Sequence, residues 1–418
     1  MPESNAYRTI EAVWRIESAR LIAGLTRMTR DVGLAEDFAQ EALVAALERW
    51  PRTGVPDNPG AWLMTTAKNR ALDLFRRREM LDRKHEQLGR EMENQREEKA
   101  QEGEDKMDDG FGDDLLRLVF ISCHPVLPPE SRVALTLRLL GGLTTPEIAR
   151  AFLVPEPTIA QRIVRAKRTL AEAKVPFEVP RKEELAGRLA SVLEVLYLIF
   201  NEGYAATAGG DWVRPALCED ALRLGRILEG LAPEESEVHG LVALMEIQAS
   251  RLGARVGLEG EPILLLDQNR SRWDHVLIRR GLIALEKAES LSDPRGSYTL
   301  QAAIAACHAR AKTPEQTDWT HIAALYDELA KLTPSPIVEL NRAVALSMAF
   351  GPAVGLELVD QLVAEPSLKD YHLLPSVRGD FLAKLGRVEE ARVEMEKAAA
   401  LTQNEQERKL LLKRASSL

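Results

Sequence analysis

Hydrophobic residues in the first part of the chain recur at the three- and four-residue spacing of amphipathic helices. Ile16, Leu21 and Leu25 mark a first helix, and a second series of apolar positions runs through residues 38–50. Proline cannot donate the next backbone hydrogen bond, so Pro51 is expected to stop the second helix. The opening segment is therefore predicted to be helical, with a break at this proline.

A loop and a third helix are predicted next. Residues 52–60 are dense in proline and glycine, which break regular structure. A helix is expected from about residue 61 to the arginine run at 76–78, where cations favour the negative end of the helix dipole. Its expected buried stripe consists of Leu63, Ala67, Ala71 and Leu74.

The composition changes at residues 81–113, which are highly charged and poor in aromatic and β-branched residues. Such a stretch buries too little apolar surface to offset its ordering entropy, so it is predicted to be a linker that is helical at most at its start. Apolar periodicity returns in short helices over 114–180, and 185–418 is predicted to be a long helical region. Together with residues 1–80, these segments predict an all-α protein.

Two similar units are visible near the C-terminus. Residues 337–345 and 374–382 begin comparable apolar helices, and each leads into a second amphipathic helix, around 356–362 and 391–400. Helix pairs that recur every 35–40 residues are typical of tetratricopeptide-like repeats. The C-terminal region is therefore predicted to be a helical-repeat domain.

A short helix, a tight turn and a second helix are predicted within residues 143–170. Thr144 or Thr145 can cap the first helix, and residues 153–156 form the turn. The apolar face of the second helix consists of Ile159, Ile163, Ala166 and Leu170. Its opposite face presents Thr158, Gln161, Arg162, Arg165 and Arg168, with Lys167 nearby. An apolar anchor opposite forked guanidinium groups suits a helix that reads the DNA major groove; a solvated basic helix is the alternative.

Charge is distributed unevenly along the chain. The net charge of −9 argues by itself against nucleic-acid binding. Residues 1–80 carry +1, residues 81–114 carry −7, residues 115–182 carry +6 and residues 183–418 carry −9. Attraction to phosphate depends on the local field rather than on the total, so the basic segment around the helix-turn-helix fits DNA contact.

Membrane and metal sites are not expected. No apolar run reaches the roughly 18–20 residues of a membrane-spanning helix, and the N-terminus does not fit a secretory signal, so a cytoplasmic location is expected. Three cysteines at wide spacing predict neither a disulfide framework nor a metal site. Neighbouring helical residues point about 100° apart, so Cys123-His124 and Cys307-His308 are not expected to converge on a metal ion. No cofactor is expected.

One polar cluster in the C-terminal region could line a pocket. It consists of Asp267, Arg270, Arg272, Trp273, Asp274 and His275. A buried ion-pair network that joins helices is the favoured interpretation of this cluster. The known phosphate-, dinucleotide- and zinc-protease motifs are missing from the sequence, so no catalytic residues are assigned and the protein is not expected to be an enzyme.

Two parts of the chain resemble one family. Residues 35–43, 59–63 and the segment 69–73 with its arginine run resemble domain two of extracytoplasmic-function RNA polymerase sigma factors. Residues 135–170, with the helix-turn-helix, resemble their domain four. The likeness follows the order of the family and covers about residues 1–175.

The resemblance implies an alternative sigma factor that binds core RNA polymerase, through its β′ and β subunits, and directs promoter-specific transcription initiation. The helix over 35–50 would dock on the β′ coiled coil through Asp37, Gln40 and Glu41. The third helix would hold the melted non-template strand of the minus-ten element through Asn69, Asp73, Arg76 and Arg77. The second helix of the helix-turn-helix would read the minus-thirty-five element through Thr158, Gln161, Arg162, Arg165 and Arg168.

The region 185–418 exceeds a minimal sigma factor. Segments 201–204, 266–274 and 298–305 resemble the subgroup with a tetratricopeptide-like C-terminal extension. This likeness implies a regulatory or assembly role that replaces a separate anti-sigma protein, with an unidentified protein or small ligand as its partner. Two alternatives stay open: a helix-turn-helix regulator that binds DNA without polymerase, and a repeat scaffold with an enzyme site in 195–310.

Overall fold

The structure is a computed structural model that describes residues 2–89, 111–152, 154–206, 208–257 and 260–418. The described chain is almost wholly helical, which confirms the predicted all-α class. It divides into two compact units, Met1–Val195 and Leu196–Leu418. None of the helices in these described ranges is both long enough and apolar enough to cross a membrane.

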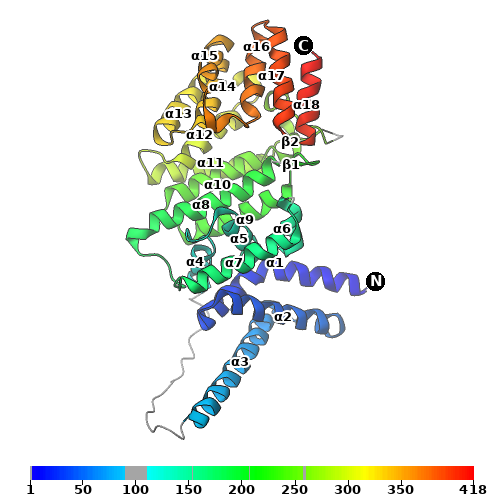
Figure 1. Cartoon of the computed structure of the whole chain (residues 1–418), viewed down its shortest axis with the longest axis vertical. Helices are drawn as coiled ribbons and strands as arrows, with labels where there is room; N and C mark the ends of the chain where they lie inside the picture. The colour runs from blue at the N-terminus through cyan, green and yellow to red at the C-terminus, as the bar shows by residue number, and fades with distance from the viewer. Residues whose placement is uncertain (1, 90–110, 153, 207, 258–259) are drawn as a thin grey trace. The chain divides into compact units, whose positions relative to one another are not determined.

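The first unit contains the helices that correspond to the predicted N-terminal segments (Figure 1). They are α1 (Pro2–Thr29), α2 (Val32–Thr53), α3 (Pro59–Gly89), α4 (Phe111–Ser122), α5 (Pro129–Leu139), α6 (Thr145–Phe152), α7 (Glu156–Glu172) and the first part of α8 (Lys182–Tyr204). Helices α1, α2 and α3 pack against one another, and α4 packs against α1 and α5. Trp50 at the end of α2 meets Trp62 of α3 edge to face, with ring centroids 5.3 Å apart.

Helix α2 ends later than predicted. Pro51 lies inside its last turn, and the helix runs on to Thr53. A proline removes one backbone donor, which the final turn of a helix can lose without breaking. The stop comes instead at Gly54, whose φ of 85° favours glycine and whose N–H donates to the carbonyl of Trp50. The prediction that Pro51 stops the helix is wrong by one turn.

Helix α3 is also longer than predicted, since it continues to Gly89. Its first nine residues beyond Met80 lie in the segment predicted to be a linker that is helical at most at its start. Residues 90–110, the greater part of that predicted linker, lie outside the described residues. The buried stripe of α3 is confirmed at Leu63, Ala67 and Ala71, and the fourth position, Leu74, is half-buried.

The first part of α8 belongs to the first unit because side chains tie it to α4 and α5. Arg132 of α5 donates to Glu194 at 2.9 Å, and Arg188 donates to the carbonyl of Phe120 at 2.8 Å. The hydroxyl of Ser191 donates to the carbonyl of Cys123 at 2.6 Å. The boundary between the units therefore falls inside α8, later than the division expected near residues 180–185.

The second unit is a series of packed helices. It contains α9 (Pro215–Leu231), α10 (Ser236–Ala249), α11 (His275–Leu291), α12 (Ser297–Arg310), α13 (Trp319–Leu332), α14 (Pro336–Phe350), α15 (Pro352–Leu362), α16 (Leu373–Lys384), α17 (Val388–Leu401) and α18 (Glu405–Ser416). Each helix from α12 to α17 packs on the helix that follows it, and α10 packs on both α11 and α12. Short 3-10 turns η1 (Leu252–Ala254), η2 (Leu265–Asp267) and η3 (Arg270–Arg272) connect α10 to α11.

The two predicted repeat units are confirmed as pairs of packed helices, α14 with α15 and α16 with α17 (Figure 1). Small residues let the helices approach closely. A Cβ on Gly355 of α15 would lie 2.6 Å from the Cβ of Ser347 and 2.8 Å from the ring of Phe381. Leu340, Val359 and Phe381 belong to one buried core shared by these helices.

A two-residue parallel pairing joins the start and the end of the second unit. Strand β1 (Ala208–Gly209) pairs with β2 (Gln403–Asn404). The buried side chain of Asn404 donates to the carbonyl oxygens of Ala206 and Asp211 at 3.0 and 2.8 Å. The same side chain caps α18 by accepting from Gln406 and Glu407. One asparagine therefore anchors the last helix to the loop that follows α8.

Candidate nucleic-acid interface

The predicted helix-turn-helix is formed by α6 and α7. Thr144 and Glu147 make a capping box at the start of α6: the Glu147 N–H donates to the Thr144 hydroxyl at 3.4 Å, and the Thr144 N–H donates to the Glu147 carboxylate at 2.7 Å. Of the two predicted caps, the structure uses Thr144. Leu153 in the turn lies outside the described residues. Pro157 occupies the first turn of α7, where its missing N–H is tolerated.

Helix α7 has the two faces that the sequence predicts. Its buried residues are Ile159, Ile163, Ala166 and Leu170. The predicted reading residues divide by exposure. Gln161, Arg165 and Arg168 are exposed, whereas Thr158 and Arg162 are half-buried. Within the described residues no carboxylate forms an ion pair with Arg162 or Arg165, so both guanidinium groups have donors to offer to an anion.

Two other cations of α7 have protein partners. The Arg168 Nε donates to Glu172 on the same helix at 2.6 Å, and this bond raises the pKa of Arg168. Lys167 forms an ion pair with the carboxylate of Glu36 in α2. Arginine stays charged with or without an acidic partner. To contact DNA, Arg168 must therefore exchange Glu172 for a phosphate or a base edge.

Helix α3 carries the residues predicted to hold the melted strand. Asn69, Asp73, Arg76 and Arg77 are all exposed. Arg76 lies 3.8 Å from Asp73, one turn apart in sequence. An ion pair between two side chains this exposed contributes little to stability and leaves both groups accessible.

Helix α2 carries the residues predicted to dock on polymerase. Asp37 is exposed, and Glu41 is exposed and pairs with Arg70 of α3 at 2.7 Å. Gln40 is half-buried, and its Nε2 donates to Glu36 at 2.5 Å. Asp37 is therefore the predicted residue whose carboxylate is most open to a partner protein.

The structure adds Glu36, which sequence reasoning missed. Its side chain is 4% exposed, and Oε1 accepts from the Arg138 Nε of α5 at 2.6 Å while Oε2 pairs with Lys167. Burial works to raise its pKa, but Lys167 and Arg138 outweigh that effect and hold the pKa below the ordinary value of 4.5. A glutamate among the apolar positions of α2 was the available signal.

A second buried carboxylate joins α1 to α4. Asp114 is 2% exposed at its side chain and pairs with Arg117 at 2.7 Å and with Arg27 of α1 at 3.3 Å. Beside it, a cleft of about 670 Å³ opens between the junction of α1 and α2 and the C-terminal end of α7. Arg30 and Lys174 are among the cations that line it. Two buried acids thus connect the helices of the predicted domain two with those of domain four.

The predicted ion-pair network in 267–275 is not formed. Asp267, Arg272 and His275 are exposed, and no ion pair links any residue of that cluster to another within the described residues. Asp274 is instead the N-cap of α11, accepting from the N–H groups of Val276 and Leu277. The sequence places many charged residues here, but the local fold exposes most of them to solvent and uses Asp274 as a helix cap.

The cysteines are free and buried at all three positions. No group of three metal-ligating side chains is found in the part of the chain that the structure describes. His308 packs edge to face on Trp319, with ring centroids 5.1 Å apart, and burial together with Arg251 and Arg270 lowers its pKa to about 4.

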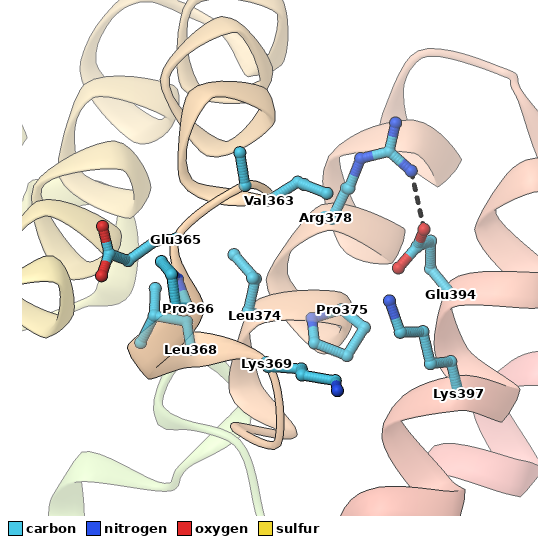
Figure 2. Close-up of a pocket in the computed structure, with 11 residues that line it drawn as sticks. Val363, Glu365, Pro366, Leu368, Lys369, Leu374, Pro375, Arg378, Glu394 and Lys397 are labelled. Carbon is cyan, nitrogen blue, oxygen red and sulfur yellow. Dashed lines mark hydrogen bonds and ion pairs between the residues drawn. The ribbon is translucent and has the colours of Figure 1, made fainter.

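A groove of about 230 Å³ lies in the repeat region, between η5 (Pro366–Leu368), α16 and α17 (Figure 2). Figure 2 shows Arg378 turned toward Glu394, with which it bonds at 2.7 Å. Lys369 and Lys397 also line the groove, beside apolar Leu374 and Pro375. Arg378 also donates to Asp360, so two carboxylates already balance the charge of its guanidinium group.

Comparisons with known proteins agree with the two parts of the first unit. Residues 16–80 match Sigma-70 region 2, and residues 117–170 match Sigma-70 region 4. Residues 188–289 match a family of unknown function, DUF6596. An uncharacterized protein of Rhizobium meliloti, R00370, is 43% identical over 387 residues, which cover 92% of this chain and 90% of that protein. A probable ECF RNA polymerase sigma factor of Mycobacterium tuberculosis, SigI, is 28% identical over 174 residues, 41% of this chain and 57% of SigI.

Proposed function

Because the chain belongs to the extracytoplasmic-function sigma factors, with a helical C-terminal extension, we propose that α2, α3 and α7 divide its contacts among polymerase, the melted strand and duplex DNA. As an alternative sigma factor it directs transcription initiation, binding core RNA polymerase and promoter DNA. Sigma factor families generally work by binding rather than by catalysis.

The surface of α7 is the observation that carries the proposal. Four apolar residues anchor the helix, and the opposite face offers Gln161, Arg162 and Arg165 to a partner. We propose that this face, with Thr158 and Arg168, reads the minus-thirty-five element in the major groove. The exposed face of α3, with Asn69, Asp73, Arg76 and Arg77, is proposed to hold the unpaired non-template strand.

We further propose that α2 docks on the coiled coil of the β′ subunit through Asp37, Gln40 and Glu41, and that the β subunit contributes to the same assembly. The match of residues 16–80 to Sigma-70 region 2 supports this over a regulator that binds DNA without polymerase. Such a regulator has no use for a region 2 segment.

The test is run-off transcription with purified core polymerase, comparing the full chain with Arg165→Ala and Arg181→Ala. Arg181 is an exposed arginine of the same unit that lies outside α7. One lost base or phosphate contact costs about 1–3 kcal/mol, so R165A is expected to lower initiation roughly 5- to 100-fold at limiting concentration. R181A is expected to match the unaltered chain. Equal initiation by both variants would contradict the assignment of α7.

Docking on polymerase is tested by Asp37→Ala, with Glu48→Ala as the matched control on the same helix, since both carboxylates are exposed. D37A is expected to weaken binding to core polymerase, measured by fluorescence anisotropy without DNA. Because the promoter is absent, a loss here is independent of α7. Unchanged binding would remove Asp37 from the interface.

The second unit is proposed to modulate the first. A chain ending at Val195 keeps the whole first unit and removes the apolar second half of α8. Its initiation per folded molecule, with folding checked by circular dichroism, is expected to differ from that of the full chain. Identical initiation at every concentration would exclude modulation in this assay.

A further inference from the structure

A buried cluster of arginines and aromatic rings lies in the second unit and includes Arg270 and Trp273 of the polar cluster described above. Arg251 follows α10 and is 8% exposed. Arg255 lies 3.7 Å from the ring centroid of Tyr204, and Arg270 lies 4.9 Å from that of Trp273. Arg251 stands over both rings, at 5.8 Å from Tyr204 and 5.7 Å from Trp273. The rings therefore hold three guanidinium groups close together.

These three cations have neutral partners. Arg251 donates to the hydroxyl of Tyr204 at 2.7 Å and to the side-chain oxygen of Gln248. Arg255 donates to the carbonyl of Tyr204, and Arg270 to the carbonyl of His308, at 3.1 and 2.7 Å. Within the described residues no carboxylate forms an ion pair with any of the three.

The electrostatic cost of this arrangement is visible in Arg251. Burial, together with the neighbouring Arg255 and Arg270, lowers its pKa. The acid that acts on Arg270, Glu315, is fully exposed and forms no ion pair with it. Buried charges in proteins are ordinarily paired, so a group of like charges without an acid is an exception that requires a cause.

Unpartnered donors point to the cause. Among the residues that the structure describes, six buried nitrogen atoms in the cluster have no hydrogen-bond partner: Nε of Arg251, Arg255 and Arg270, Nε1 of Trp212 and Trp273, and Nδ1 of His308. Five of these nitrogens are donors, and the imidazole nitrogen can be one. Gln268 adds an unpartnered acceptor, its Oε1. What the cluster lacks is an acceptor-rich, negatively charged group.

We propose that this cluster is the binding site of a small anion that carries a carboxylate or phosphate group. Arginine forks match both groups, and the rings of Tyr204 and Trp273 fix the forks in place. Tyr204, Trp212 and Arg255 are half-buried, so the anion reaches the site from their side. Binding neutralises the repulsion among the arginines and stabilises the second unit. Its effect on transcription rests on the proposed modulation by that unit; binding itself does not.

The experiment measures thermal unfolding of the full chain with inorganic phosphate and, separately, with citrate, each against sodium chloride of equal ionic strength. We expect a concentration-dependent rise in Tm of several degrees with at least one anion. A rise with phosphate alone identifies a phosphate group as the ligand, and a rise with citrate alone identifies a carboxylate. Arg255→Gln is expected to lose this rise, and Arg279→Gln, an exposed arginine on α11 outside the cluster, to keep it.

Two results would overturn the site: neither anion raises Tm, or the rise is equal in R255Q and in the unaltered chain. If no anion changes Tm and R255Q lowers the Tm measured in chloride, the arginines are structural. If R255Q does not fold, Arg255→Lys replaces it: lysine keeps the charge but lacks the planar fork, so the rise in Tm is expected to shrink. Run-off transcription with and without the effective anion then tests coupling, so loss of modulation and loss of binding are separate outcomes.

Discussion

Single buried side chains decide how the first unit is held together. Glu36 and Asp114 each accept from cations on two helices or more, and each is almost fully removed from water. A buried carboxylate stays charged at low cost only when cations pair with it, and removing the carboxylate leaves those cations without a counter-charge.

Glu36→Gln is expected to lower the free energy of unfolding of the first unit by about 3 kcal/mol, since it leaves Arg138 and Lys167 without their acid. Urea denaturation of the full chain, compared with Glu48→Gln on the same helix, measures this.

The pH dependence of stability gives a second readout of the role of Glu36. The pKa of Glu36 is held below 4.5 in the folded chain, so its contribution is present above that value and is lost as pH falls through the folded pKa. Acidification should therefore destabilise the unaltered chain more than E36Q; equal acid sensitivity would contradict the role of this carboxylate.

The cysteines are expected to be inert in the folded protein. Burial raises the pKa of Cys123 and Cys307, and raises that of Cys218 to about 12. Thiolate is the reactive form, so iodoacetamide at pH 8 should leave all three unmodified until guanidinium is added. Mass spectrometry counts the adducts in both conditions. Rapid alkylation of the native chain would show that these sites open readily.

At the scale of elements, helix ends depend on local hydrogen bonds, and some of the residues that form them can be predicted from the sequence. Thr144, one of the two predicted caps, forms a capping box with Glu147, whereas the cap of α2 by Asp31, which accepts from Leu34, was not predicted. Helix lengths are less predictable. Pro51 is carried within α2, and α3 runs past its arginine cluster, because side-chain periodicity does not state where the last turn ends.

Thr144→Ala is expected to lower the stability of the first unit by about 1 kcal/mol and to weaken promoter binding, because α6 loses its capping box and supports α7 less well. Thr144→Ser keeps the hydroxyl and is the matched control. Chemical denaturation and a gel-shift assay with holoenzyme measure the two effects. An alanine variant as stable as the serine variant would place the cap elsewhere.

At the scale of the whole molecule, charge is separated along the chain, and the basic excess of 115–182 coincides with the helix-turn-helix. Attraction to DNA phosphate releases counterions, so binding must weaken as salt rises. The chain's acidic total of −9 does not prevent this, because the field near α7 is set by the nearest charges.

The salt dependence of holoenzyme binding to promoter DNA gives a direct measure of this local field. Each phosphate contact contributes a slope of about −0.9 in log K against log salt, so Arg165→Ala should make the slope less steep by about that amount. Asp37→Ala, which alters no DNA contact, should leave the slope unchanged. A slope that R165A does not alter would mean that Arg165 contacts no phosphate, so any contact it makes is to a base edge.

The sequence by itself determined the all-helical class, the helix-turn-helix with its apolar and basic faces, the paired helices near the C-terminus and the likeness to sigma factors. These follow from periodicity, breakers and short motifs, which are local properties of the chain. Tertiary structure decided what depends on contacts between distant residues. It made Glu36 and Asp114 buried links, left Asp267 and His275 exposed where an ion-pair network was predicted, and gathered Arg251, Arg255 and Arg270 around two rings. No local pattern encodes these neighbours, because burial and pairing of a charge are set by the helices that pack against it.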